Sequence, residues 1–194
     1  MVVALMPLHM KSKIKRIIVS TYQAVSGSGK AAIDELHNQT EQHMSGKEIT
    51  REVYPKQIAF NCIPQIDVFE SNGFTKEEMK MMLETKKIMH IPDLKISATC
   101  VRVPVFNGDA ESVLIEFESK LDAKEASEIL RYTDGVRVID SDLDGNVDYS
   151  TQIAMSGFDD VTVSRIRDDP SGENTISLWC VADNIRKGAA TNTV

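Results

Sequence analysis

The stretch that most constrains this chain is residues 20–30, Ser-Thr-Tyr-Gln-Ala-Val-Ser-Gly-Ser-Gly-Lys. An apolar run at residues 14–19 precedes it and predicts a partly buried strand, and an amphipathic segment at residues 30–36 predicts a short helix. The two glycines between them indicate a strand-to-helix turn. Such a turn places Gln23 at the strand end and open backbone N–H groups at the helix start, where an anion or a polar cofactor group can bind. A purely structural turn is the alternative interpretation.

Composition limits the partners of the protein. The 194 residues are enough for one substantial core, or for one domain with an appendage, and 42% apolar with 26% charged residues is typical of a soluble globular protein. The net charge of −7 argues against a nucleic-acid or anionic membrane partner, because both require a basic face. The apolar residues 1–10 predict a buried helix that is far too short to span a bilayer.

The cysteines predict neither a disulfide framework nor a metal site. Cys62, Cys100 and Cys180 are widely spaced, each within an apolar or strand-like run, and no Cys-x-x-Cys or histidine-rich spacing occurs. We expect all three to be buried as small hydrophobic residues in a protein of the reducing cytoplasm.

Hydrophobic patterning and turn signals alternate strands with helices along the chain. Thr75 and Glu78 have the spacing of a capping box and predict a helix start. An Asn-Gly pair at residues 107–108 predicts a hairpin-like pair of strands, and residues 168–172 predict a second hairpin. The expected strands are residues 14–19, 58–63 (a strand or an extended segment), 95–106, 112–117, 135–139, 161–166 and 175–181, and the expected helices are residues 1–10, 30–36, 75–89, 122–131 and 183–190.

These elements predict an α+β fold, with a mixed, largely antiparallel sheet and helices on one face. The other face of the sheet would be open, and dimerisation would cover it. The polar residues 37–57 are expected to form a solvated excursion, either a surface loop or a dimer-facing arm.

The sequence of residues 20–27, Ser-Thr-Tyr-Gln-Ala-Val-Ser-Gly, resembles a signature motif of aspartate-semialdehyde dehydrogenases, the enzymes that reduce aspartyl phosphate with NADPH. The resemblance extends in order over nearly the whole chain. Its further blocks are Met-Val-Val-Ala-Leu at 1–5, Phe-Asn-Cys-Ile-Pro-Gln-Ile-Asp at 60–67, Glu-Glu-Met-Lys at 77–80, Ser-Ala-Thr-Cys-Val-Arg-Val-Pro-Val at 97–105 and Asp-Asn-Ile-Arg-Lys-Gly-Ala-Ala at 183–190.

The resemblance implies that residues 1–194 are the dimerisation and catalytic domain of such an enzyme, similar to the C-terminal domain of glyceraldehyde-phosphate dehydrogenase. In the family, the segment that matches residues 1–10 continues a helix whose first turn carries the nucleophilic cysteine. That cysteine would fall a few residues before Met1. The chain is therefore expected to lack the nucleophile and the dinucleotide-binding domain, and to stop before its last helix is complete.

Arg102 is the lone charge in an apolar strand, and an unpaired buried charge is costly. A guanidinium binds a carboxylate through two parallel hydrogen bonds, so Arg102 fits the clamp that the family uses for the substrate α-carboxylate. An internal salt bridge to a buried glutamate is the alternative interpretation.

The resemblance assigns the other substrate contacts. Gln23 matches the glutamine that orients the substrate, and its alternative is a polar residue at a strand end. Glu77 and Lys80 lie three residues apart on one helix face and match the pair that the family uses for the substrate's ammonium and phosphate. Without the resemblance, this pair would be interpreted as a solvated helix face.

The resemblance also implies NADP as the cofactor. Ser26 and Gly27 match the turn that contacts NADP, and Asn184, at a predicted helix start, matches the residue that approaches the nicotinamide. Whether this fragment binds NADP is left open, because the family's main dinucleotide-binding domain would be missing.

One position departs from the family pattern. The family places its acid/base histidine seven residues after the arginine, and this chain has Asp109 there. A histidine titrates near neutrality and can shuttle a proton, whereas an aspartate with an ordinary pKa of roughly 3.9 stays ionised and can only accept one. Asp109 is therefore expected to be non-functional in catalysis, and the alternative is a turn residue after Asn-Gly.

Two functional hypotheses follow. The first is the C-terminal domain of an NADP-dependent aspartate-semialdehyde dehydrogenase of amino-acid biosynthesis, inactive alone because the nucleophile, the dinucleotide domain and the histidine are absent. The second is a non-catalytic partner, in a homodimer or a mixed dimer, that modulates a full-length dehydrogenase. A related acyl-phosphate reductase with another substrate is a third, weaker option. The coding sequence upstream of Met1 would separate the first two.

Overall fold

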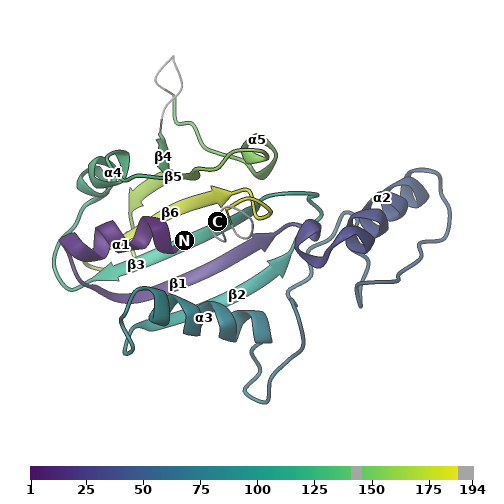
Figure 1. The fold of residues 1–194 in the computed structure, drawn as a ribbon, viewed down its shortest axis with the longest axis horizontal. Helices are drawn as coiled ribbons and strands as arrows, with labels where there is room; N and C mark the ends of the chain where they lie inside the picture. Colours follow the sequence, from purple (N-terminus) through teal and green to yellow (C-terminus); the bar gives the residue numbers. More distant parts are fainter. Residues whose placement is uncertain (141–145, 188–194) are drawn as a thin grey trace.

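The computed structural model describes residues 1–140 and 146–187, and its centre is one six-stranded sheet (Figure 1). The strands are β1 (Ile14–Gln23), β2 (Lys95–Arg102), β3 (Asp109–Phe117), β4 (Val136–Ile139), β5 (Val161–Asp168) and β6 (Thr175–Ala182). They lie in the order β2-β1-β3-β6-β5-β4. The three inner pairs are antiparallel, while the edge strands β2 and β4 pair in parallel with β1 and β5. The expected α+β class with a mixed sheet is confirmed.

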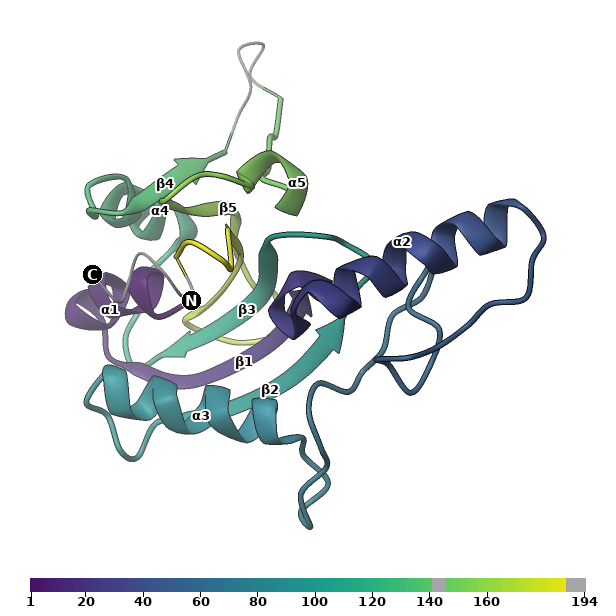
Figure 2. The same cartoon turned by 45° about the vertical axis from the view of Figure 1, so that its right-hand side comes forward.

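Helices cover mainly one face of this sheet (Figures 1 and 2). The helices are α1 (Val2–Lys11), α2 (Lys30–Met44), α3 (Lys76–Ile88), α4 (Ala123–Arg131) and α5 (Gln152–Met155), with a 3-10 turn η1 (Val25–Ser28) between β1 and α2. Apolar residues of α1 and α4 and the C-terminal end of α3 pack on the same sheet face, whereas the short α5 packs on the opposite face. Helix α2 projects away from the body (Figure 2).

The main core lies between the sheet and the covering helices. On β1, Ile17 and Val19 are buried on this face and belong to the same cluster as Leu5 and Leu8 of α1. Their spacing of two on the strand and three on the helix matches the periods of the two elements. Burial of this apolar surface is the dominant favourable term for folding, so the expected burial of the helix near the N-terminus is confirmed for this stripe.

The hairpin expected from residues 95–106 and 112–117 is wrong. Strand β2 ends at Arg102, and β1 lies between β2 and β3. The chain between them crosses the end of β1, where Val103 N–H donates to the Gln23 carbonyl at 3.0 Å. An inner strand satisfies backbone groups along both of its edges, which a two-stranded hairpin cannot do. The second expected hairpin, β5 with β6, is confirmed.

The segment expected to be a solvated excursion is ordered by two polar side chains. Helix α2 extends to Met44, well past the expected end at residue 36, and buries Glu35 and Gln39. The Glu35 carboxylate accepts hydrogen bonds from the backbone N–H groups of residues 52–54. The side-chain oxygen of Gln39 accepts hydrogen bonds from the backbone N–H groups of residues 58 and 59. The expectation of a loop is wrong for residues 37–44 because these buried polar residues look, in sequence, like a solvated face.

Four smaller expectations also need correction. Cys62 is exposed, although Cys100 and Cys180 are buried as expected. The apolar pattern of residues 75–89 predicts that Leu83 faces the core with Met79, Met82 and Met89, but Leu83 is exposed. Residues 58–63 form a single bridge, between Ile63 and Arg102, instead of a strand. Within the helix expected at residues 183–190, residues 184–187 form a turn, and residues 188–190 lie outside the described residues.

Much of the opposite face of the sheet is left uncovered. On β1, Ile18 points to this side and is 41% exposed, while its neighbour Ile17 on the helix side is completely buried. Near the end of β1, Tyr22 packs on Trp179 of β6, with ring centroids 5.3 Å apart. Met155 of α5 covers only the adjoining patch of this face.

Candidate active site

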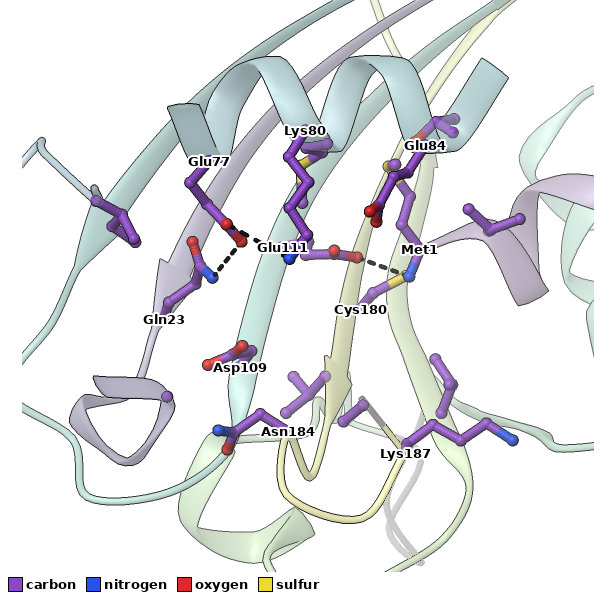
Figure 3. Close-up of a pocket in the computed structure, with 18 of the residues that line it drawn as sticks. Met1, Gln23, Glu77, Lys80, Glu84, Asp109, Glu111, Cys180, Asn184 and Lys187 are labelled. Carbon is purple, nitrogen blue, oxygen red and sulfur yellow. Dashed lines mark hydrogen bonds and ion pairs between the residues drawn. The ribbon is translucent and has the colours of Figure 1, made fainter. Parts of the chain in front are cut away.

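A cavity of about 810 Å³ opens at one end of the sheet, between α3 and the N-terminal end of α1 (Figure 3). The sheet register brings the strand ends together there, because Gln23 is the partner of Arg102 and Asp109 is the partner of Ala182. Seven of the eight residues predicted from the sequence line this cavity: Gln23, Gly27, Glu77, Lys80, Arg102, Asp109 and Asn184. The eighth, Ser26, reaches the site through hydrogen bonds to Asn184.

Gln23, Glu77 and Lys80 form one polar group on the wall made by β1 and α3 (Figure 3). Gln23 Nε2 donates to Glu77 Oε1 at 3.4 Å, and Lys80 Nζ lies 3.6 Å from Glu77 Oε2. Thr21 Oγ1 in turn donates to the side-chain oxygen of Gln23, Oε1, at 3.0 Å and so fixes the orientation of the side-chain amide. The lysine and glutamate therefore face the cavity as a pair, with the lysine side chain the more exposed of the two.

Arg102 is buried, with 5% of its surface exposed, at the base of the cavity. Its Nη1 donates to the Ala24 carbonyl, and its buried Nε has no hydrogen-bond partner among the described residues. No salt bridge to a described carboxylate engages this guanidinium, so the alternative of an internal salt bridge is wrong. Buried donors are almost always paired, so an unpartnered guanidinium nitrogen on a residue that lines a cavity indicates an acceptor from outside the chain.

The turn after β1 is tied to the turn after β6. Asn184 Nδ2 donates to Ser26 Oγ at 3.0 Å, and Asn184 Oδ1 accepts the Gly108 N–H at 2.8 Å. A Cβ at Gly27 would lie 3.3 Å from Arg102 Nη1 and 3.9 Å from Asn184 Nδ2. A side chain at position 27 would therefore crowd both polar groups, and glycine leaves the backbone open to the cavity.

Asp109 differs from the sequence-based expectation. Its Oδ1 accepts the Ala24 N–H at 2.8 Å. Burial raises the pKa of Asp109 to about 6, even though the Ala24 N–H and the Arg102 guanidinium favour the charged form. The expectation of an ordinary pKa, and of a carboxylate that can only accept a proton, is therefore wrong. Asp109 can exchange a proton not far below neutral pH.

The other half of the cavity holds residues that the sequence analysis missed. The Met1 amino group pairs with Glu111 Oε2 at 2.9 Å, beside Cys180 of β6 (Figure 3). Spacing could have found two of these residues. Glu111 follows Asp109 by two on the same strand face, and Glu84 lies on the α3 face of Glu77 and Lys80, four residues after the lysine.

The walls of the cavity carry charges of both signs. Its acidic residues are Asp67, Glu77, Glu84, Asp109 and Glu111, and its cationic side chains are Lys80, Arg102 and Lys187. A small ligand with both an ammonium and anionic groups is complementary to such a lining.

The cysteines do not supply an activated nucleophile. Burial raises the pKa of Cys100 to about 11 and that of Cys180 to about 12. Cys62 does not line the cavity. Among residues 1–140 and 146–187, no group of three or more His, Cys, Asp or Glu side chains could hold a metal ion. In that same part of the chain, no helix has both the length and the apolar character needed to cross a membrane.

Known proteins are similar to this chain in sequence and in fold. The family described as "Semialdehyde dehydrogenase, dimerisation domain" matches residues 5–187. The aspartate-semialdehyde dehydrogenase of Aquifex aeolicus is 53% identical over 195 residues, which cover 100% of this chain and 57% of the relative. The crystal structure of aspartate semialdehyde dehydrogenase II from Vibrio cholerae matches with a TM-score of 0.93 at 49% identity, over 98% of this chain and 56% of that chain. The structure of the same enzyme complexed with ASA has a TM-score of 0.92, at 49% identity over 97% and 55% of the two chains.

A mixed sheet with three covering helices and a charged cavity at its strand ends defines a domain of the semialdehyde dehydrogenase type. The chain belongs to the semialdehyde dehydrogenase dimerisation-domain family, whose match spans nearly all of its residues. The resemblance to aspartate-semialdehyde dehydrogenases is confirmed, and the relatives are oxidoreductases. The chain spans about 57% of the length of the first of these curated relatives.

Proposed function

We propose that residues 1–194 form the substrate-anchoring and dimerising part of an NADP-dependent aspartate-semialdehyde dehydrogenase of the cytoplasm. The reaction is the reductive dephosphorylation of L-aspartyl 4-phosphate to aspartate semialdehyde, with release of phosphate. The observation that carries the proposal is the buried, unpartnered Nε of Arg102 in a cavity that also holds Gln23, Glu77 and Lys80. Identity of 53% to the Aquifex aeolicus enzyme supports it.

Each of the four substrate-anchoring residues, which are Gln23, Glu77, Lys80 and Arg102, binds or orients a different group of the substrate. The free edge of the Arg102 guanidinium binds the α-carboxylate. Glu77 binds the α-ammonium, and Lys80, whose side chain is exposed to the cavity, binds the phosphate as a mobile point charge. Gln23, held by Thr21, orients the acyl group between them. This set is complementary to a ligand with one amine, one carboxylate and one phosphate.

The part of the cavity beside Gly27 and Asn184 suits a cofactor. NADP, when bound, supplies the hydride. Ser26, Gly27 and Asn184 would border its nicotinamide, and the bare backbone at Gly27 leaves the room that a flat ring needs. Asp109 lies between Asn184 and Gln23 (Figure 3), where a protonatable carboxyl can give or take a proton at the reacting group.

The 194 residues alone are proposed to be inactive. Acyl-phosphate reduction by this route needs a thiolate that forms a thioester. The raised pKa of Cys180, about 12, leaves almost no thiolate at neutral pH, and neither Cys62 nor Cys100 lines the cavity. The nucleophile and the main dinucleotide-binding surface must therefore be supplied by additional protein.

The uncovered sheet face is proposed to pair with a second copy of the chain. Ile18, Tyr22 and Trp179 give this face an apolar centre, and the family description names a dimerisation domain. The same surface would also accept a full-length relative in a mixed dimer. Mixed pairing predicts that the tagged chain co-purifies with a co-expressed full-length dehydrogenase and that Ile18→Arg abolishes this.

The function is tested by joining residues 1–194 to the dinucleotide-binding half of the Vibrio cholerae enzyme. The assay is phosphate-dependent reduction of NADP with aspartate semialdehyde. We expect no turnover from the 194-residue chain alone and measurable turnover from the joined chain. Arg102→Lys in the joined chain should lower kcat/KM by about 10- to 100-fold, because the bidentate contact is lost. Lys87→Ala, on the outer face of α3, is the matched surface control and should change nothing.

Position 109 gives a second arm of the same assay. Asp109→His in the joined chain should keep or raise turnover, since a histidine titrates close to the raised pKa of about 6 of Asp109, whereas Asp109→Asn should lower turnover by at least about tenfold, since an amide cannot exchange the proton. Turnover that is unchanged by Asp109→Asn would mean that Asp109 does not occupy the acid/base position. Turnover by the 194-residue chain alone would contradict its inactivity, and a joined chain without turnover even with Asp109→His would contradict the function itself.

A further inference from the structure

We propose that Asp183, the residue directly after β6, is a positioning residue that holds Asn184 and the turn before Asp109 in place beside the cavity. The inference rests on the proposed function for the part that Asn184 plays next to the nicotinamide. It deepens that function by giving a role to a buried carboxylate that does not itself line the cavity.

The carboxylate of Asp183 is buried and accepts four hydrogen bonds. Among residues 1–140 and 146–187, it is the one aspartate that is almost completely buried, with 2% of its surface exposed. Its Oδ1 accepts the N–H groups of Ile185 at 2.9 Å and Arg186 at 3.0 Å. Its Oδ2 accepts the Gly157 N–H at 2.7 Å and Asn107 Nδ2 at 2.9 Å. Four donors fill the lone-pair sites of a carboxylate and compensate for its removal from water.

The first oxygen caps the turn that carries Asn184. The Lys187 N–H donates to the Asp183 carbonyl at 2.9 Å, so residues 183–187 form one helical turn with Asp183 at its N-cap position. Aspartate is a preferred N-cap residue, because its side chain accepts N–H groups that have no partner within the turn. The cap therefore fixes the backbone that carries the Asn184 side chain.

The second oxygen joins this turn to two other segments. Asn107 lies in the turn before Asp109, and Gly157 follows α5. Asn107 Nδ2 also donates to Ser156 Oγ at 2.7 Å, so the two segments contact each other as well as Asp183. One carboxylate thus aligns three segments that lie far apart in the chain.

The side chain of Asn184 lies where these segments border the cavity (Figure 3). Its Oδ1 accepts the Gly108 N–H at 2.8 Å, and its Nδ2 donates to Ser26 Oγ at 3.0 Å. Gly108 directly precedes Asp109. A shift between the two turns would break the contact of Asn184 with Gly108, because a hydrogen bond weakens steeply away from its preferred distance and angle. Asp183 therefore acts through Asn184.

The hydrogen bonds keep Asp183 ionised. Burial by itself would raise the pKa of this carboxyl, but the N–H groups of Gly157 and Arg186 and the Asn107 amide outweigh burial and lower the pKa below its ordinary value of 3.8. The carboxylate is therefore charged at neutral pH. An amide has one oxygen and two N–H donors, so asparagine at this position cannot accept all four hydrogen bonds.

The substrate anchors are held by different contacts. Thr21 donates to the side-chain oxygen of Gln23 at 3.0 Å, and the backbone of Arg102 exchanges two hydrogen bonds with Ile63, at 2.8 and 2.9 Å. None of the four hydrogen bonds of Asp183 reaches these residues. Loss of the Asp183 contacts should therefore weaken cofactor binding and leave the substrate anchors in place.

Asp183→Asn tests this arrangement, because it keeps one oxygen for the cap and places N–H donors against Gly157 and Asn107. In the 194-residue chain, hydrogen exchange of the Gly108 N–H, followed by NMR, should accelerate by at least about tenfold, since its acceptor on Asn184 is displaced. In the joined chain, the KM for NADP should rise by at least about tenfold. The KM values for aspartate semialdehyde and phosphate should change by less than about twofold.

Asp159→Asn is the matched control. Asp159 is an exposed aspartate that contacts the same turn, through an ion pair with Arg186 at 2.8 Å. Its replacement should change neither the exchange of the Gly108 N–H nor the KM for NADP, because exposed ion pairs contribute little.

Asp183→Ser is a second variant, for use if the asparagine form does not fold. The serine hydroxyl can still cap the turn, but it cannot accept the hydrogen bonds of both other segments. We expect the same faster exchange at Gly108 and the same rise in the KM for NADP. Slow exchange of the β1 and β3 amides shows that each variant is folded.

Two results would overturn the proposal. If the Gly108 N–H exchanges at the unmodified rate in the folded Asp183 variants, Asp183 does not position Asn184. If the KM values for NADP and for both substrates rise together, or all stay the same, Asp183 does not act on the cofactor side of the site.

Asn184→Ala separates this proposal from the function. If Asn184→Ala raises the KM for NADP and Asp183→Asn does not, the Asp183 inference alone fails. If Asn184→Ala leaves the KM for NADP unchanged while Gly108 exchanges faster in Asp183→Asn, the positioning of Asn184 stands and the cofactor role of Asn184 in the proposed function fails. Hydrogen exchange needs no turnover, so it tests the positioning even in an inactive chain.

Discussion

The two faces of the sheet are built from the same strands, yet they serve different purposes. Ile17 and Ile18 are consecutive residues of β1, and the first is completely buried beneath the helices while the second is 41% exposed. The helix-covered face combines the core with the charged cavity, whereas the opposite face carries the exposed Ile18 and, among the described helices, is covered by α5 near one end. One face of this sheet thus stabilises the chain and holds the candidate site, and the other is the face that we propose for association.

The largest expected effect comes from the matched pair Ile17→Ala and Ile18→Ala. Ile17→Ala leaves a cavity in the main core and should lower the free energy of unfolding by about 2–5 kcal/mol. Ile18→Ala should lower that of the monomer by less than about 1 kcal/mol, because the side chain is already partly in water. Urea unfolding under dilute, monomeric conditions measures both. Equal losses would contradict the assignment of the two faces.

The next effect concerns association through the open face. Ile18→Arg should weaken the dimer by about 100-fold or more, because a charge would be buried without a partner at the centre of the interface. The monomer should keep its stability, since position 18 lies outside the core. Sedimentation equilibrium gives the dissociation constant. Met10→Arg, at an exposed residue of α1 on the other side, should leave the dimer intact.

The pH dependence of the unfolding free energy tests whether Asp109 is buried on the helix-covered face. Its pKa is raised from 3.8 to about 6, so between those values the folded chain binds more protons than the unfolded chain and stability falls as pH rises. Above pH 6 the charged carboxylate costs up to about 2 kcal/mol, after allowance for its contact with the open cavity. Asp109→Asn should therefore stabilise the chain at neutral pH and have no effect below about pH 4. Stabilisation that is the same at both pH values would rule out a raised pKa.

The smallest effect is at the start of α3, which carries Glu77 and Lys80 over the cavity. Thr75 Oγ1 accepts the Glu78 N–H, and the Glu78 side chain accepts the Thr75 N–H at 2.7 Å and the Cys100 N–H at 2.9 Å. Thr75→Ala should cost about 1 kcal/mol of unfolding free energy. Ser71→Ala, at an exposed position before the helix, is the control. A loss at Thr75 that matches the control would show that the capping box does not hold α3 in place.

Much of the local structure was predictable because it depends on neighbouring residues. The end of β1 at Gln23, the turn that follows it, the capping box at Thr75 and the β5–β6 hairpin all follow from periodicity, glycine and capping patterns. Arg102 stood out because a single charge in an apolar strand needs a partner or a ligand. These patterns lie within a few residues of one another, so the sequence displays them directly.

The tertiary structure alone decided the features that need distant partners. The position of β1 between β2 and β3, the raised pKa of Asp109 and the anchoring of residues 47–63 by Glu35 each depend on groups far apart in the chain. Strand order is set by which edges find hydrogen-bond partners, and a pKa by how much water the fold removes around a carboxyl. The residues of the site could be identified from short sequence motifs. That they meet in one cavity could be seen only in the folded structure, because burial and proximity are properties of the folded chain.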